Sequence, residues 1–166
     1  MRLFKPFMAL LGVIALLDSV ATPAEAKDLS GRLGVGFTNE FSNSTISNNV
    51  PAISGKYGMT KDFHLLGALG FNTVSPTSFT LAGKIFKNIF YETYLNFYMA
   101  TGLAYLKANQ SGVEILGVLG CEFFIPGVDS LGFLFETGVS ASNVTGSFVL
   151  KTVGFTFIQA GMHFYF

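Results

Sequence analysis

This chain of 166 residues lacks several features that are common in soluble proteins. It has one cysteine, Cys121, no tryptophan, and only 12% charged residues, where a soluble domain has about a quarter. A single thiol excludes an intrachain disulfide framework. Ten basic residues balance ten acidic ones, so no net charge attracts a polyanion, and we expect no nucleic-acid partner.

Long hydrophobic runs are also missing after residue 26. No later segment has the roughly 20 consecutive apolar residues of a transmembrane helix, and the periodicity of an amphipathic helix is absent. Yet half of the chain is hydrophobic, 19 residues are Phe, and the mean hydropathy is +0.51. These values predict one domain whose apolar surface meets something other than water.

Residues 1–26 have the pattern of a cleaved export signal. Two basic residues open the segment, the apolar run Phe7–Leu17 follows, and Ala24-Glu25-Ala26 is an A-x-A cleavage pattern. The apolar run is too short to cross a bilayer as a helix. We therefore expect a mature domain over residues 27–166.

The mature region consists of short alternating runs rich in Phe, Val, Leu, Tyr and Gly, which predict strands. Eight such runs are Gly31–Phe41, Ala52–Met59, Phe63–Asn72, Phe79–Phe86, Tyr94–Leu106, Val113–Phe124, Leu131–Ser140 and Phe155–Phe166. The sequence therefore predicts an all-β domain of about eight strands.

Two kinds of connection alternate between these runs. Four are longer and rich in Ser, Asn, Thr and Gly: Ser42–Asn49, Asn72–Ser78, Lys107–Gly112 and Ala141–Ser147. Three are shorter: Thr60–Asp62, the region at Lys87–Asn88, and Pro126–Asp129. An even number of strands with short turns at one end and longer loops at the other predicts a transmembrane, antiparallel, up-and-down β-barrel.

The two faces of the predicted strands differ in character. In-strand charges fall on even-numbered positions, namely Arg32, Glu40, Lys56, Lys84, Glu114, Glu122 and Glu136. The opposite parity is apolar, as at Leu33, Val35 and Phe37. Eight strands enclose a narrow interior, so we expect Gly, Ala, Ser and Thr inside and the large Phe, Leu and Tyr outside. Such an exterior is stable in hydrocarbon and insoluble in water.

The polar residues of the inward parity predict a network that fills the lumen. Buried charges must be paired, and the candidate set is Arg32, Lys56, His64, Lys84, Glu122, Glu136, Gln159 and His163. The alternative is a gated or selective pore. Eight strands leave little free bore, which favours the filled lumen.

The last residues, Met162–Phe166, read Met-His-Phe-Tyr-Phe and continue the alternation. This pattern resembles the terminal strand of bacterial outer membrane proteins. Residues 31–166 as a whole resemble the small eight-stranded barrels of the OmpA/OmpX-like group. The resemblance implies insertion into the outer membrane of a Gram-negative bacterium, contact with its lipids, and recognition of Phe164 and Phe166 by the barrel-assembly machinery.

Two roles agree with this resemblance. The first is a structural or surface-interaction barrel, which we expect to be a monomer. The second is a narrow channel or transporter for ions or small molecules, including hydrophobic ones. Ser, Asn and Thr dominate the loops, which carry no charged or aromatic binding cluster, and this favours the first role.

Catalytic and metal-binding patterns are weak. Barrels that resemble the lipid A deacylases have a Ser two residues from a His, but here Leu66 follows His64 and Tyr165 follows His163 at that spacing. Nucleophilic catalysis needs a base beside the nucleophile, so we expect no enzyme. Two histidines without clustered carboxylates predict no metal site and no cofactor.

The main alternative fold is a lipocalin-like secreted barrel, which also has eight strands and an export signal. Such a barrel would have a Gly-x-Trp motif and usually a disulfide, whereas this chain has no Trp and a single Cys.

Overall fold

The structure is a computed structural model that describes residues 27–39, 52–73, 75, 77–107, 109–144, 146–153 and 159–166. The predicted export signal, the predicted connection Ser42–Asn49, and Glu40 with Phe41 lie outside the described residues. Regular structure in the described part is all β. Among these residues we find no helix with the length and apolar character needed to cross a membrane.

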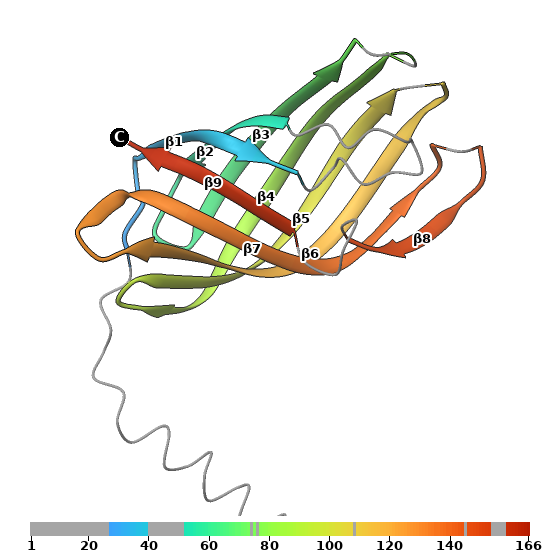
Figure 1. The fold of residues 1–166 in the computed structure, drawn as a ribbon. Helices are drawn as coiled ribbons and strands as arrows, with labels where there is room; N and C mark the ends of the chain where they lie inside the picture. The colour runs from blue at the N-terminus through green and yellow to red at the C-terminus, as the bar shows by residue number, and fades with distance from the viewer. Residues whose placement is uncertain are drawn as a thin grey trace, which may run out of the picture.

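Nine strands form one antiparallel sheet in the described residues. They are β1 (Leu33–Thr38), β2 (Ala52–Gly58), β3 (Phe63–Asn72), β4 (Ser78–Glu92), β5 (Leu95–Lys107), β6 (Ser111–Ile125), β7 (Val128–Ser142), β8 (Val149–Thr152) and β9 (Gln159–Tyr165). Pairing of β1 with β9, β9 with β7, and β7 with β6 closes eight of them into a ring (Figure 1). The predicted eight-stranded antiparallel barrel is confirmed.

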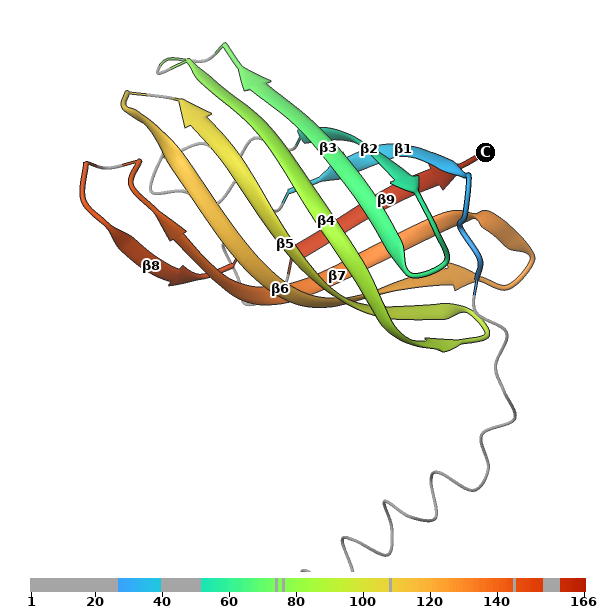
Figure 2. The ribbon, with the colours of Figure 1, turned by 180° about the vertical axis from the view of Figure 1, so that it is seen from behind.

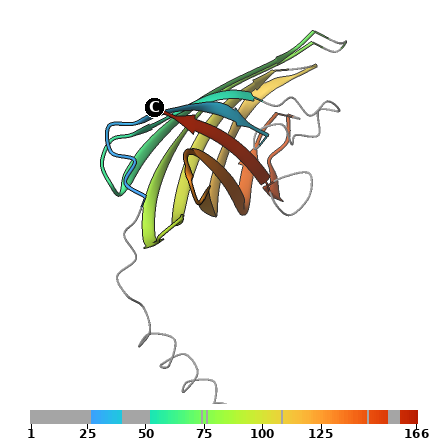
Figure 3. The same cartoon turned by 60° about the vertical axis from the view of Figure 1, so that its left-hand side comes forward.

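The ring has two distinct ends. We call the end with the short turns, such as Thr93–Tyr94 and Pro126–Gly127, the turn end, and the opposite end the loop end. Strands β4 to β7 have 13 to 15 residues, whereas β1, β2 and β9 have six or seven. The long strands therefore extend beyond the short ones at the loop end (Figure 2). In Figure 3, β1 in blue and β9 in red lie in front of the green and yellow strands.

The last wall of the barrel is made of two pieces, β8 and β9, both paired with β7. Val139 lies opposite Thr152, whereas Glu136 lies opposite Gln159. An advance of three residues along β7 therefore corresponds to an advance of seven residues along the chain from β8 to β9. The sequence pattern does not predict β8, because it is only four residues long and follows a polar loop. The first residues of the predicted run Phe155–Phe166, through 158, lie outside the described part.

The predicted turn at Lys87–Asn88 is wrong, because β4 continues to Glu92. Asn88 is buried, and its side-chain amide donates to the Lys61 carbonyl at 2.9 Å while its backbone N–H donates to the Asp62 carbonyl at 2.8 Å. The Asn that suggested a turn instead bonds to the neighbouring β2–β3 turn. A register shift after Asn88 lets the longer hairpin bend there.

The predicted alternation of faces is confirmed along the strands, for example in β3, where exposed and buried residues alternate from Phe63 to Gly70. However, the expectation that large residues stay outside is wrong. Phe86, Tyr98, Phe124 and Tyr165 are all buried in the lumen. Inward-facing glycines make room for them, since a Cβ atom at Gly34 would lie only 2.6 Å from the Tyr165 ring.

Candidate functional site

Two buried ion pairs cross the lumen. The Lys56 ammonium on β2 lies 2.6 Å from a Glu122 carboxylate oxygen on β6, and the Lys84 ammonium on β4 lies 2.6 Å from Glu136 on β7. All four residues are at most 5% exposed. Each pair joins strands from different sides of the ring, so it links walls that share no backbone hydrogen bonds.

Tyrosine hydroxyls complete the coordination of both carboxylates. The Tyr165 hydroxyl donates to Glu122 at 2.5 Å, and the Tyr98 hydroxyl donates to Glu136 at 2.6 Å. Each carboxylate therefore bonds to both an ammonium and a hydroxyl. Such extra hydrogen bonds are what make a buried ion pair tolerable in a medium of low polarity.

An aromatic ring joins the two ion pairs into one network. The Phe86 ring has the Lys56 ammonium 4.4 Å and the Lys84 ammonium 4.8 Å from its centroid, and it packs edge-on against Tyr98 at 5.0 Å. Cations are attracted to the face of such a ring. We call Lys56, Lys84, Phe86, Tyr98, Glu122, Glu136 and Tyr165 the lumen network.

The other predicted lumen residues lie around this network. Arg32 is half-buried at the turn end and donates to the Tyr165 carbonyl at 3.1 Å. His163 is buried, with its Nε2 atom 2.8 Å from the Ser54 hydroxyl. His64 and Gln159 are also buried, but both ring nitrogens of His64 and the Oε1 atom of Gln159 have no hydrogen-bond partner among the described residues.

An N-terminal strap, residues 27–31, covers the turn end of the lumen. Its Leu29 is 1% exposed and clusters with Phe124 and Tyr165. The Lys27 carbonyl accepts a hydrogen bond of 3.1 Å from the Asn96 side chain on β5, on the far side of the ring from β1. The strap therefore lies across this mouth of the barrel.

A glycine in β2 allows the strap to approach the wall. Gly31 donates its N–H to the Gly58 carbonyl at 2.8 Å, and a Cβ atom at Gly58 would lie 2.0 Å from the Leu29 carbonyl oxygen. Any larger residue at this position would displace the strap. The first predicted strand begins at Gly31, and nothing in the composition of residues 27–30 indicates a contact with the barrel.

The loop-end half of the lumen differs in character. Its buried residues are mostly small, hydroxyl-bearing or aliphatic, among them Ala68, Thr80, Ala82, Ala104, Leu106, Leu116 and Ser140. Its one described ion pair joins Glu114 to Lys151 at 3.5 Å, and the Lys151 side chain is 20% exposed. Charge and aromatic area are therefore concentrated in the turn-end half.

Sequence reasoning missed Tyr98, Phe86 and Tyr165 as members of the network. The signal that could have found them is parity, because Tyr98 and Phe86 occupy even positions like the charges, and Tyr165 shares the parity of His163. The assumption that eight strands leave no room for rings hid this signal. The glycines opposite the rings provide that room.

The contacts of the lumen network join opposite walls of the ring. The carboxylates of Glu122 and Glu136 accept hydrogen bonds from ammonium and hydroxyl donors. Within the described ranges, no group of three or more His, Cys, Asp or Glu residues could hold a metal ion. Comparison of the chain with family models, curated proteins and solved structures found no match.

Proposed function

We propose that this chain is an integral outer membrane β-barrel with a structural or surface-interaction role, and that the lumen network fills its interior. The single observation that carries the proposal is the distribution of polarity. Large apolar side chains cover the outside of the ring, whereas Lys56, Lys84, Glu122 and Glu136 are buried inside. Water-soluble proteins have the opposite arrangement.

The uncharged outward face of β5 is about as tall as the apolar band of a transmembrane barrel. Outward positions of β5 between Leu95 and Tyr105 carry no charge. At about 3.3 Å per residue this stretch is about 33 Å long, and a strand tilt of about 40° reduces it to about 25 Å along the barrel axis. A transmembrane barrel has an apolar band of about 25 Å.

Exposed aromatic residues gather at the two borders of this band. Phe37, Phe71, Phe79 and Tyr105 lie towards the loop end, and Tyr57, Phe63, Phe90 and Phe164 lie towards the turn end. Aliphatic residues such as Val35 and Leu103 lie between them. Aromatic girdles at both membrane–water interfaces are typical of outer membrane barrels.

The predicted export signal and the alternating pattern of β9 support the same location. In this proposal the turn end faces the periplasm and the loop end faces the outside, as is usual for such barrels. The barrel-assembly machinery would recognise Phe164 and Phe166 during insertion, as the resemblance to the OmpA/OmpX-like group implies. Lipids of the outer membrane would be the main partners of a monomeric barrel without enzymatic activity.

Paired substitutions of opposite parity test the location of the wall. Val35→Arg places a charge on the outer face, where it costs about 2–4 kcal/mol at the bilayer midplane, so this variant should insert poorly into lipid vesicles. Thr38→Arg is inward-facing near the loop end and should insert much better. Equal insertion of the two variants, measured by protease protection, would contradict the proposal.

A narrow channel is the second candidate, and one observation favours it. The Oδ1 atoms of Asn88 and Asn96 and both ring nitrogens of His64 are buried without a hydrogen-bond partner among the described residues. Buried polar atoms of this kind are usually satisfied by water, and a file of water could carry ions. A large and steady single-channel conductance of the refolded protein would favour this role over the filled lumen.

A further inference from the structure

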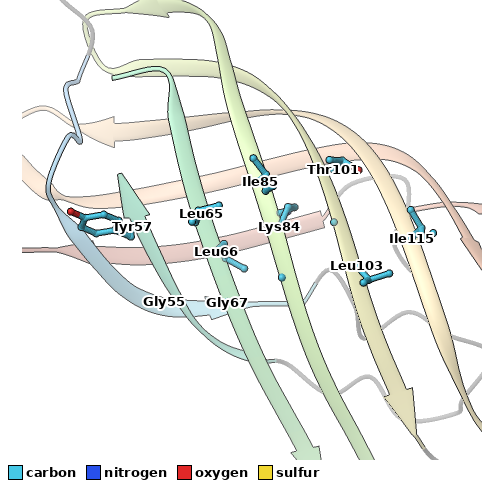
Figure 4. Close-up of a pocket in the computed structure, with 12 residues that line it drawn as sticks. Gly55, Tyr57, Leu65, Leu66, Gly67, Lys84, Ile85, Thr101, Leu103 and Ile115 are labelled. Carbon is cyan, nitrogen blue, oxygen red and sulfur yellow. The ribbon is translucent and has the colours of Figure 1, made fainter. Parts of the chain in front are cut away.

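The outer wall has an apolar groove with a floor of glycines. Gly55 on β2, Gly67 on β3 and Gly83 on β4 are outward-facing and lie side by side in the register of the sheet. The groove has a volume of about 650 Å³, within the range of small-molecule sites. Tyr57 and Leu65 stand along its turn-end side, as Figure 4 shows.

The barrel itself does not require glycine at these three positions. A Cβ atom at Gly67 would meet nothing within 4 Å, and the nearest atoms to Gly55 and Gly83 are at 4.0 and 3.9 Å. Their φ angles are not positive, unlike those of Gly31 and Gly127. Glycine weakens a strand because it has no side chain to pack, so the row has a cost that the wall alone does not explain.

A second pocket, which includes several polar residues, lies on the same wall near the loop end. It has a volume of about 730 Å³ and is lined by Ser75, Thr77, Ser78, Phe79, Tyr105, Lys107 and Asn109. Lys107 forms no ion pair with a carboxylate of the described residues. The pocket therefore offers a positive charge together with hydroxyl and amide groups.

The register of β4 and β5 connects the pocket to the groove. Lys107 pairs with Phe79 at the rim, and four residues further along β5, Leu103 pairs with Gly83 in the groove. Four residues of a strand span about 13 Å. A site with a positive charge at the border of the apolar band thus lies along the same two strands as the apolar groove, which is an arrangement that fits a lipid molecule.

We propose that this wall binds one anionic lipid, with its charged headgroup at Lys107 and an acyl chain along Gly55, Gly67 and Gly83. The inference rests on the proposed function, because the groove meets acyl chains only if the barrel lies in a membrane. One lysine near a membrane surface favours an anionic lipid by a factor of about five. The hydroxyl and amide groups beside Lys107 would hydrogen-bond the headgroup oxygens.

The test measures lipid binding by native mass spectrometry of the refolded barrel in a nonionic detergent. The probes are phosphatidylglycerol, which is anionic, and phosphatidylcholine with the same acyl chains, which has no net charge. Wild-type protein should bind phosphatidylglycerol about fivefold more tightly. Equal binding of the two lipids would overturn the headgroup assignment.

Filling the groove should remove binding of both lipids. Gly67→Leu places a side chain on the groove floor and should weaken both lipids at least about tenfold, since the apolar contact is lost. The matched control is Gly117→Leu, an outward glycine of β6 that also has nothing within 4 Å and does not line the groove. Similar lipid binding of these two variants would overturn the proposal.

Neutralising the rim should affect only the choice of headgroup. Lys107→Gln should reduce phosphatidylglycerol binding to the phosphatidylcholine level. Lys87→Gln replaces an exposed lysine in the turn-end half of β4 and should leave the preference intact. Loss of the preference in both variants would point to general charge and overturn the specific role of Lys107.

The remaining outcomes are also decisive. Gly83→Val is a second filling variant, and failure of both it and Gly67→Leu to fold, while Gly117→Leu folds, would assign the glycine row to barrel closure and overturn the proposal. A dimer that Gly67→Leu dissociates, without bound lipid, would assign the groove to a second copy and also overturn it. Failure of the wild-type barrel to insert into vesicles would contradict the proposed function itself. Normal insertion of the wild-type barrel, together with lipid binding that Gly67→Leu and Lys107→Gln leave unchanged, would contradict only this inference.

Discussion

The two halves of the lumen differ in how their polar groups are satisfied. In the turn-end half, Glu122 and Glu136 each bond to a lysine and a tyrosine at 2.5–2.6 Å and are at most 5% exposed. In the loop-end half, the Glu114–Lys151 pair is longer, at 3.5 Å, and its lysine is partly exposed. The turn-end half should therefore provide most of the stabilisation that depends on specific side chains.

This difference indicates a division of labour along the barrel axis. A closely packed half, covered by the N-terminal strap, holds opposite walls together. The loop-end half is lined by small residues such as Ala68 and Ala82, whose contacts depend little on exact geometry. Changes at the turn end should accordingly be costly and those at the loop end mild, an expectation that three substitutions can test.

The largest effect is expected for Glu122→Ala. It leaves the Lys56 ammonium buried without a carboxylate and the Tyr165 hydroxyl without its acceptor. Removing one member of a buried pair costs about 3–5 kcal/mol. The free energy of unfolding, measured by urea titration of the barrel in lipid vesicles, should fall by this amount.

A double substitution provides the control for this prediction. Lys56→Met combined with Glu122→Met removes both charges, and replacing a buried pair by apolar residues is often close to neutral. We expect the double variant to lose less than about 2 kcal/mol, chiefly from the Tyr165 hydroxyl. A double variant as unstable as Glu122→Ala alone would show that the pair itself is strongly stabilising.

An intermediate effect is expected for Leu29→Ala in the strap. This side chain is 1% exposed and contacts Phe124 and Tyr165. Truncating a buried leucine costs about 2–5 kcal/mol, and the lower end applies at a mouth where neighbours can relax. Ser30→Ala, at an exposed position of the same strap, should change the unfolding free energy by less than about 0.5 kcal/mol. Equal effects of both variants would mean that the strap does not support the barrel.

The smallest effect is expected for Glu114→Gln at the loop end. Glu114 is buried, but its partner Lys151 is 20% exposed and remains hydrated when the carboxylate is replaced by an amide of the same shape. The same urea titration should therefore show a loss of less than about 1 kcal/mol. A loss comparable to that of Glu122→Ala would remove the distinction between the two halves. A loss near zero would show that the two halves differ in their contribution to stability by more than their ion-pair distances suggest.

Sequence alternation predicts the barrel well, because each face of a strand has a period of two residues and meets one environment. The run Phe63–Asn72 is an example, and its predicted bounds agree with β3. Asn88 shows where this reasoning fails. Its preference for turns is a local property, whereas its actual position depends on hydrogen bonds to the β2–β3 turn, which no local pattern contains.

The membership of the lumen set is more predictable than its pairing. Charges on the inward parity identify Lys56 and Glu122 as interior residues, but their contact joins positions 66 residues apart. That contact depends on the tilt and closure of the ring, which shift the register between opposite walls. The strap is unpredictable for the same reason, since Leu29 finds its site only on the finished barrel.

The strap also has a consequence for the order of folding. Its partners, Gly58 on β2, Asn96 on β5 and Asp129 on β7, belong to strands that come together only when the sheet has curled and joined its edges. The strap can therefore dock only after that step, even though it precedes all of the strands in the sequence. Protection of the Gly31 amide against hydrogen exchange would report the moment at which the cylinder is complete.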